Sequence, residues 1–390
     1  ELRKQVNHTL RRLDWTVPRP ELWKAAEAVR ALGGGVLPLL LEGLGGTLQR
    51  KQKSAEGFWA MGTSAESAIP ELEKRLESES HYVAFALVGI GPAALPLLLR
   101  ALSHPQPPVR SGTASGIAHI AGCLPLDGEF AEQLIPPLIE RVSDRYDFVR
   151  RDAVSAIGKV RRCPDLCVPL LLNSLQRGSP HVQHASMFAL SGFGEHARAA
   201  IPLLRSAARS EDKDSRFFAV RALAWGWPSD PKVVPCLVES LADPDPSVRG
   251  EAALAIGAKC QFPDIAVPAL IEFIQRPENI PLGWQPVSAL QSWGSLAKNA
   301  VPLLLHALEK NGSTHLDECL RVALRAIDPE IDLQNGPVPP APPALIKAGR
   351  LKELYGKAKA NRDLRLKDLL RYPIWRWCMD LPFPDEADGP

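Results

Sequence analysis

The segment VVPCLVESLADPDPSVRGEAALAIG (233–257) decides the fold. Its first half places apolar residues at helical spacing behind Pro235, and a proline in the first turn of a helix is tolerated because that N–H has no intrahelical partner. Its second half has apolar residues at i, i+3, i+4 and i+7 and ends in glycine, a common C-cap. The segment therefore predicts two amphipathic helices, one starting at Pro235 and one ending at Gly257.

The motif apolar-Pro-x-Leu-x-x-x-Leu, present here at Pro235, recurs along most of the chain. It explains much of the chain's unusual total of 37 prolines. Nine copies begin at Pro38, Pro70, Pro96, Pro136, Pro169, Pro202, Pro235, Pro268 and Pro302. From Pro136 onward the spacing is 33 or 34 residues, and the Ala-rich pattern ending in Gly recurs between the prolines, for example in VRRDAVSAIG (149–158). A fixed period of this length predicts a solenoid of stacked helix pairs.

The recurring pair of DPDPSVRGEAALAIG (243–257) and AVPALIEFI (266–274) resembles HEAT repeats, specifically the short kind related to phycobilin-lyase repeats. The resemblance implies an all-α, right-handed α-solenoid of nine to ten helix pairs. We expect residues 1–19 to form an N-terminal cap or the remnant of a preceding repeat, and residues 20–334 to form the solenoid. Residues 335–344 are then a Pro-rich connector, and residues 345–390 a C-terminal segment.

The resemblance also implies that the Pro-bearing helices line the concave side of the solenoid. Side chains four and five positions after each proline are then candidates for contact with a partner. These candidates are Glu42, Lys74, Arg75, Arg100, Glu140, Arg141, Glu239, Glu272, Phe273 and His306. Their changing charge fits a protein or peptide partner better than a phosphate backbone, which requires Lys or Arg throughout. The alternative is that they are ordinary solvated positions.

A second pair of positions is interpreted as structural. Arg stands fourteen residues after the proline in four copies, and Asp eight residues after it in two. These residues are Arg110, Arg150, Arg216, Arg249, Asp144 and Asp243. The resemblance suggests an Asp–Arg ladder that ties neighbouring repeats at their turns. The alternative, a row of anion-binding arginines, is weakened by Gln183 at the corresponding position of one copy.

No pattern of catalytic residues is present, so we expect no enzymatic activity and no cofactor. Cys163, Cys167, His181 and His184 approach the spacing of a zinc finger. However, the repeat register separates the cysteines from the histidines by a helix of roughly 15 Å, so we expect no metal site. The alternative function is nucleic-acid binding, as in helical-repeat DNA glycosylases, through the basic residues at 74, 75, 100 and 141 or through the C-terminal segment. Trp225 and Trp293 align with Ile157 and Ile256, which predicts core positions for both.

The C-terminal segment differs from the rest of the chain in charge. Residues 344–378 contain ten Lys or Arg and three acidic residues, a net charge of +7, although the whole chain carries only +2. The stretch RYPIWRWCMDLPF (371–383) contains Trp375 and Trp377. These residues either cap the last repeat, which solenoids require, or anchor a partner or an acidic membrane surface.

The remaining features give few indications of compartment. Seven cysteines without a C-x-x-C pair favour reduced thiols, and no apolar stretch is long enough for a membrane span. We therefore expect a cytoplasmic protein, within a larger complex. The chain begins at Glu1 rather than Met, so it could be a fragment of a longer protein.

Overall fold

The computed structural model describes residues 2–11 and 19–331, apart from gaps at 124–125, 127, 229, 260–261, 276–283 and 311–313. These residues form α-helices and short 3-10 helices, without a strand in any described range. They fall into two compact units, one ending at Phe193 and one starting at Gly194. The predicted all-α solenoid is confirmed within each unit, because successive helices pack on their neighbours in chain order. None of the described helices is long and apolar enough to cross a bilayer.

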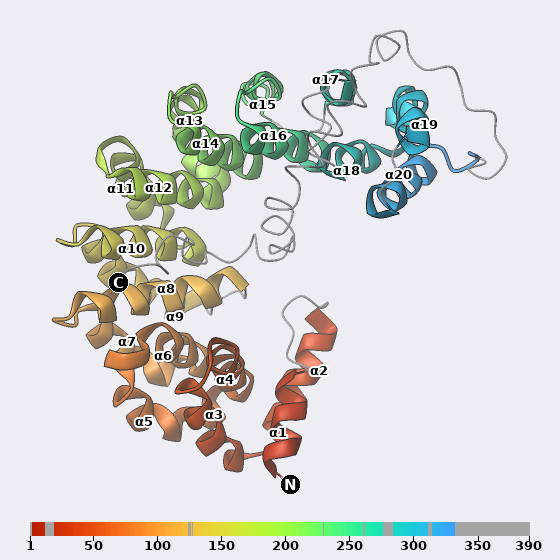
Figure 1. Ribbon diagram of the computed structural model, residues 1–390. Coiled ribbons are helices and arrows are strands. Elements are labelled where there is room, and N and C mark those ends of the chain that lie inside the picture. Colours follow the sequence, from red (N-terminus) through yellow and green to blue (C-terminus); the bar gives the residue numbers. More distant parts are fainter. Residues whose placement is uncertain are drawn as a thin grey trace, which may run out of the picture. The chain divides into compact units, whose positions relative to one another are not determined.

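Each unit is a stack of two helix layers (Figure 1). In unit 1 the Pro-bearing helices are α3 (Leu37–Leu44), α5 (Ile69–Glu73), α7 (Leu95–Leu102), α9 (Gly128–Arg141) and α11 (Pro164–Arg177). The Ala-rich helices are α4 (Leu48–Met61), α6 (Leu76–Ile90), α8 (Pro107–Cys123), α10 (Asp147–Val160) and α12 (Pro180–Phe193). Two further helices, α1 (Leu2–Arg11) and α2 (Arg19–Arg30), pack on α4 at the N-terminal end of the stack.

Unit 2 repeats this plan. Its Pro-bearing helices are α13 (Ile201–Ala207), α15 (Val234–Ser240), α17 (Pro263–Gln275) and α19 (Val301–Lys310). Its Ala-rich helices are α14 (Lys213–Gly226), α16 (Pro246–Lys259), α18 (Trp284–Ser292) and α20 (Thr314–Ile327). Figure 1 shows the first set along one side of the unit and the second set along the other.

The Ala-rich helices form the more closely packed layer. They pack directly on one another from repeat to repeat in both units, whereas successive Pro-bearing helices make few direct contacts. The more closely spaced layer of a stack of repeats lies on the inner side of its curvature. The Ala-rich layer is therefore the inner layer within each unit. The expectation that the Pro-bearing helices line the concave side is wrong.

The repeat proline begins a helix in most copies but not in all. Pro38, Pro70, Pro96, Pro202, Pro235 and Pro302 occupy the second residue of their helices, as predicted. By contrast, Pro136, Pro169 and Pro268 lie inside α9, α11 and α17. In five of the six copies whose proline is the second helix residue, a glycine with positive φ redirects the chain into a 3-10 turn just before the proline. The three other copies lack that glycine, and α11 and α17 begin instead at an earlier proline, Pro164 or Pro263.

The glycines expected to cap the Ala-rich helices lie within them instead. Gly158 is two residues before the end of α10, where a Cβ would approach the Cα of Ala189 in α12 to 2.4 Å. Gly257 in α16 stands in the same relation to Ala289 of α18, at 2.2 Å. These glycines are required because two helix backbones approach each other closely, not because a helix ends there.

Replacing Gly158 by Ala should destabilise the chain, although alanine normally stabilises a helix relative to glycine by about 1 kcal/mol. The added methyl must push α10 and α12 apart, and overpacking of this kind costs about 1–3 kcal/mol. Urea denaturation followed by circular dichroism measures the change. Gly128→Ala is the matched control, because a Cβ at this first residue of α9 meets only the far end of an arginine at 3.8 Å. Equal stabilities of the two variants would contradict the close-approach role.

Candidate interaction surfaces

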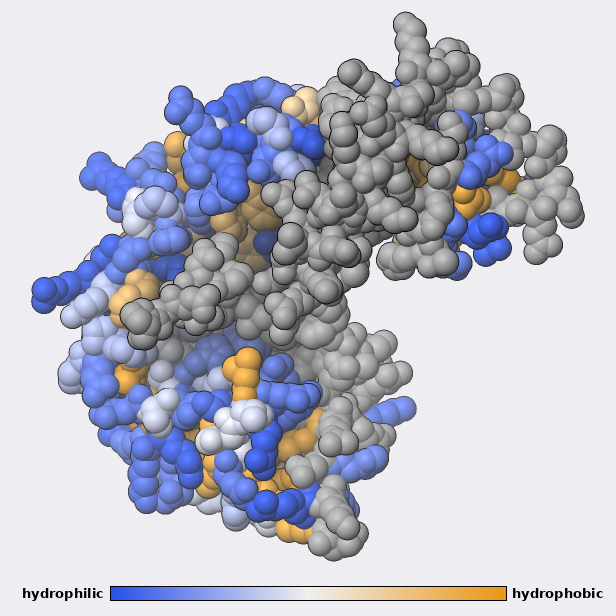
Figure 2. All heavy atoms as spheres, viewed as in Figure 1, coloured by the Kyte–Doolittle hydropathy of each residue, from blue (hydrophilic) through white to orange (hydrophobic). Residues whose placement is uncertain are grey.

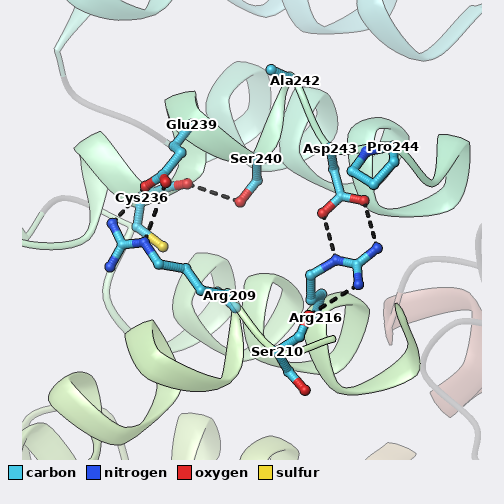
Figure 3. A pocket seen from close by; sticks show the side chains of 10 residues that line it. Arg209, Ser210, Arg216, Cys236, Glu239, Ser240, Ala242, Asp243 and Pro244 are labelled. Carbon is cyan, nitrogen blue, oxygen red and sulfur yellow. Dashed lines mark hydrogen bonds and ion pairs between the residues drawn. The ribbon is translucent and has the colours of Figure 1, made fainter. Parts of the chain in front are cut away.

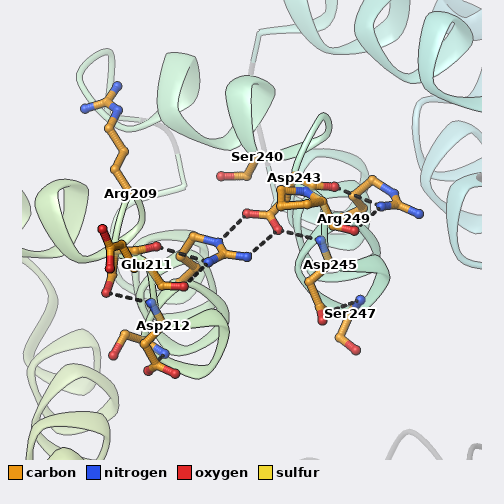
Figure 4. Close-up of polar contacts among 12 residues, drawn as sticks. Arg209, Glu211, Asp212, Ser240, Asp243, Asp245, Ser247 and Arg249 are labelled. Atoms are coloured by element: carbon orange, nitrogen blue, oxygen red, sulfur yellow. Dashed lines mark hydrogen bonds and ion pairs between the residues drawn. The ribbon is translucent and has the colours of Figure 1, made fainter.

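The Asp–Arg ladder joins neighbouring repeats at their turns. Arg110 donates from Nε and Nη2 to both carboxylate oxygens of Asp144 in the next repeat, at 2.7 and 3.0 Å. Its Nη1 donates to the carbonyls of His104 and Pro105 in its own turn. Arg216 pairs with Asp243 in the same way, and its Nη1 donates to the carbonyls of Ser210 and Glu211 (Figure 4). The ladder expected from the resemblance is therefore present at these two positions.

The ladder is a structural device, because all its hydrogen-bonding groups are engaged. Burial opposes the charged form of Asp144, but the hydrogen bond from Arg110, the backbone N–H of Tyr146 and the nearby Arg charges outweigh it and hold the pKa of Asp144 below its usual value. Both side chains are buried. Anion binding by these arginines would require them to release the aspartates, so the ladder offers no ligand site.

The ladder changes at Arg150. Its Nη1 donates to the carbonyls of Asp144 and Arg145, as in the other repeats, but its Nη2 pairs with Asp147 of its own repeat at 2.7 Å. The next repeat carries Arg177 where Asp144 and Asp243 stand in theirs. Arg150 and Arg177 are both cations, so they cannot form the ion pair that joins the other repeats.

Most charged candidates on the Pro-bearing helices form ion pairs. Glu42 pairs with Arg3 at 2.6 Å, Arg100 with Glu73 at 2.9 Å, and Glu239 with Arg209 at 2.5 Å. Lys74 pairs with Glu71, and Arg141 pairs with Glu140 and lies 3.7 Å from Asp144. Lys74, Arg100 and Arg141 each have a neighbouring acid, so the charges of these three residues of the N-terminal basic patch are balanced. This balance does not favour phosphate binding.

The remaining candidates differ in exposure. Phe273 is 1% exposed, so it is a core residue of α17 and not a contact residue. Arg75 and His306 are half-buried, and the His306 Nε2 is buried without a hydrogen bond. Glu272 lines a cavity of about 500 Å³ together with Ile271 and Leu296. Trp375 and Trp377 lie outside the described residues.

A second cavity, of about 390 Å³, lies between neighbouring turns of unit 2 (Figure 3). The pair Arg209–Glu239 stands at one end and the pair Arg216–Asp243 at the other. Cys236 lies beside the Arg209–Glu239 pair and is buried, which raises the pKa of its thiol. A protonated thiol and paired charges provide neither a nucleophile nor an unpaired charge for a ligand.

Two histidines of unit 1 form a polar cluster in the Ala-rich layer. His81 Nδ1 of α6 lies 3.1 Å from Ser115 Oγ of α8, and its Nε2 lies 3.3 Å from His119 Nδ1. Burial, followed by repulsion from His119, lowers the pKa of His81 to about 3, and burial, followed by the charge of Lys159, lowers that of His119 to about 4. Rings with such low pKa values are weak general bases at neutral pH. The cluster therefore does not indicate nucleophilic catalysis by Ser115.

The four residues of the zinc-like spacing are held apart by the fold. Cys163 and Cys167 lie at the start of α11, and His181 and His184 lie in the first turns of α12. Burial raises the pKa of Cys167 to about 11, the opposite of the thiolate that zinc requires. Within the described ranges, no three His, Cys, Asp or Glu side chains are arranged to hold a metal ion.

One known family model matches the helix pairs described above. The model for HEAT repeats matches residues 135–216, 168–257 and 201–280, in register with the helix pairs from α9 to α17. Residues 135–280 of this chain are HEAT repeats. The predicted resemblance is therefore confirmed at the level of HEAT repeats, and a search of curated proteins finds no match.

Several solved structures resemble the fold of this chain. Importin beta is 14% identical with a TM-score of 0.48, over 82% of this chain and 50% of that one. The condensin Cnd3–Cnd2 subcomplex of S. pombe is 18% identical with a TM-score of 0.45, over 77% of this chain and 49% of that one. An engineered protein is 18% identical with a TM-score of 0.41, over 83% and 98% of the two chains. At these identities the likeness concerns the fold alone.

The inner layer of the HEAT repeats in this chain carries a stripe that the sequence analysis missed. Phe217, Arg221 and Trp225 follow one another at i, i+4 and i+8 along α14, which places them on one face of the helix. Trp225 is 43% exposed, so its predicted core position is wrong. In the same repeat Trp227 is buried and donates its Nε1–H to the carbonyl of Gly194 at 3.0 Å.

The stripe differs from the equivalent positions of other repeats. In α8 the three positions hold Ser111, Ser115 and His119, and in α10 they hold Arg151, Ser155 and Lys159. Comparing the repeats in register would have revealed the two aromatic residues. Figure 2 shows that the visible face of the described residues is mainly hydrophilic.

Proposed function

We propose that this protein is a non-enzymatic scaffold that binds a protein partner through its inner, Ala-rich layer. The observation that carries the proposal is the stripe on α14, in which Trp225 is exposed and Phe217 and Arg221 are half-buried. Trp and Arg are enriched among residues that dominate protein–protein binding energy. The proposal keeps the concave face as the binding side but assigns it to different helices than the sequence analysis did.

The stripe has the packing that a contact surface needs. The rings of Phe217 and Phe218 meet edge to face, with centroids 5.5 Å apart, which fixes the orientation of Phe217. Arg221 lies near Glu251 of α16, whose carboxyl is 3% exposed, and its charge partly offsets the rise in pKa that burial gives this acid, to about 7. The side chains of the stripe are therefore partly preorganised before a partner binds, which lowers the cost of association.

The test compares the full chain with the variant Phe217→Ala/Trp225→Ala in affinity purification with quantitative mass spectrometry. Removing two anchor residues should reduce the recovery of the specific partner at least tenfold, because such truncations typically cost 2 kcal/mol or more each. Helix content should not change, since Trp225 is 43% exposed and alanine favours helix.

The matched control is Leu166→Ala/Leu296→Ala. Both leucines are 61% exposed but lie outside the Ala-rich layer, in α11 and in the 3-10 helix Gly294–Ala300. The control should recover the partner at the wild-type level. Equal recovery with both double variants would contradict binding through the inner layer.

A further inference from the structure

The turn before α10 lacks the side-chain cap found in the three repeats that follow it. The N-cap residue of the Ala-rich helix is Ser179, Asp212 or Asp245 in three other described repeats, and each of these side chains accepts a backbone N–H of the first turn. In α10 the N-cap is Tyr146, which makes no such hydrogen bond. Two positions later the chain has Phe148, where Pro108, His181, Asp214 and Ser247 stand in the other copies.

The two aromatic side chains are not part of the core. Tyr146 is 40% exposed and Phe148 is 37% exposed, whereas the adjacent Val149 is fully buried and packs the start of α10. The rings lie 5.8 Å apart, and the Arg145 guanidinium lies 5.8 Å from the centre of the Tyr146 ring. We call Arg145, Tyr146 and Phe148 the aromatic turn. It gives up a helix cap and exposes two large rings, a local conflict of the kind that marks functional sites.

The charge around the aromatic turn is positive. Of the acids in this turn, Asp144 is buried against Arg110, and Asp147 accepts from both Arg150 and Ser179. Arg145 is exposed and forms no ion pair within the described part of the chain. Arg177, which takes the ladder position of an aspartate in the following repeat, is also exposed and unpaired in the described ranges. Arg145 and Arg177 are thus two exposed guanidinium groups without an acidic partner in the described ranges, the first beside the Tyr146 ring and the second at the ladder position of the next repeat.

We propose that the aromatic turn, together with Arg177, binds an acidic segment of a protein partner that packs an aromatic or aliphatic side chain against the rings. Carboxylates of the segment pair with Arg145 and Arg177, and arginine suits this role because its planar fork can bind a carboxylate through two parallel hydrogen bonds. Tyr and Arg side chains are also typical anchors of protein interfaces. This surface belongs to unit 1 and is separate from the α14 stripe of unit 2, so either proposal can fail without the other.

The test screens the full chain against two bead-displayed libraries of 12-residue peptides. One library draws its charged residues from Asp and Glu and the other from Lys and Arg, with the same apolar residues in both. The proposal predicts binders from the acidic library only. Their affinities, measured by fluorescence anisotropy, should fall at least tenfold with Tyr146→Ser/Phe148→Ser and at least tenfold with Arg145→Glu/Arg177→Glu. For Arg145→Glu/Arg177→Glu, the loss of affinity should be larger at low salt than at high salt. For Tyr146→Ser/Phe148→Ser, the loss should not depend on salt.

The variants separate binding from folding. Tyr146→Ser installs the N-cap residue that the equivalent turn has in Ser179, so the melting temperature should not fall. Lys213→Glu, an exposed charge reversal at the first residue of α14, is the control for net charge and should leave the affinities unchanged. Phe217→Ala/Trp225→Ala should also leave them unchanged, which distinguishes this surface from the proposed inner-layer site.

Three outcomes would overturn the inference. The first is an absence of acidic binders, or an equal yield from the basic library. The second is retention of the acidic binders by the Tyr146→Ser/Phe148→Ser variant. The third is tighter binding of a 12-nucleotide single strand than of every selected peptide, with loss of that binding in the same variants, which would assign the surface to nucleic acid through base stacking.

Discussion

Replacing Asp144 by Ala is expected to lower the free energy of unfolding by about 3–5 kcal/mol, the range measured when one partner of a buried ion pair is removed. The large effect follows from what remains. The Arg110 side chain is buried and keeps its two hydrogen bonds to backbone carbonyls, but its charge loses the carboxylate that neutralises it. The backbone N–H of Tyr146 also loses its acceptor. Urea denaturation followed by circular dichroism at neutral pH measures the change.

Asp147→Ala is the control for Asp144→Ala, because both carboxylates bind an arginine in the same turn. The Asp147 side chain is 36% exposed, and Arg150 retains its contacts with the carbonyls of Asp144 and Arg145. Exposed ion pairs contribute about 0–1 kcal/mol, so this variant should unfold close to the wild type. A loss of less than about 1 kcal/mol for Asp144→Ala would show that the ladder is not a main support of the stack.

The ladder also illustrates what the sequence could predict. Arg110, Asp144, Arg216 and Asp243 recur at fixed positions of the repeat, and the resemblance to HEAT repeats implied the contacts that they make. Proline spacing and apolar periodicity likewise predicted the helix pairs, because both are local properties of the chain. Predictions of this kind succeed when the repeat itself enforces the same packing in every copy.

Other features depend on contacts between helices, which the repeat pattern does not specify. Gly158 has the sequence context of a helix end, but its role is set by the distance to Ala189 in the next repeat. Trp225 precedes a glycine, as Ile157 and Ile256 do, but counted from the repeat prolines their equivalent is Leu223, which is fully buried, and Trp225 lies on the surface. The side of the stack that faces inward depends on which helices pack more closely, a property of the whole unit.

The histidine cluster shows a further effect that no motif predicted, because His81 and His119 are far apart in sequence. Acidification is expected to destabilise unit 1 through these rings. Their folded pKa values, about 3 and about 4, lie below the ordinary value of 6.5. At pH values between the folded pKa values and 6.5, the unfolded chain binds more protons than the folded chain. The stability that the two neutral rings contribute is therefore fully present above pH 6.5 and is lost as the pH falls below it. At pH 5 each ring should cost about 2 kcal/mol, or about 4 kcal/mol for the pair.

The variant His119→Phe tests this prediction. A phenyl ring keeps the edge-to-face contact that His119 makes with Phe85, at a centroid distance of 4.9 Å, but does not titrate. The variant should therefore lose about 2 kcal/mol less than the wild type between pH 8 and pH 5, whatever its stability at pH 8. Glu251, with its pKa raised to about 7, favours the folded state as the pH falls and thus opposes the trend, but it does so equally in both proteins. Equal pH dependence in the two proteins, or an NMR titration of either ring near pH 6, would contradict the buried neutral pair.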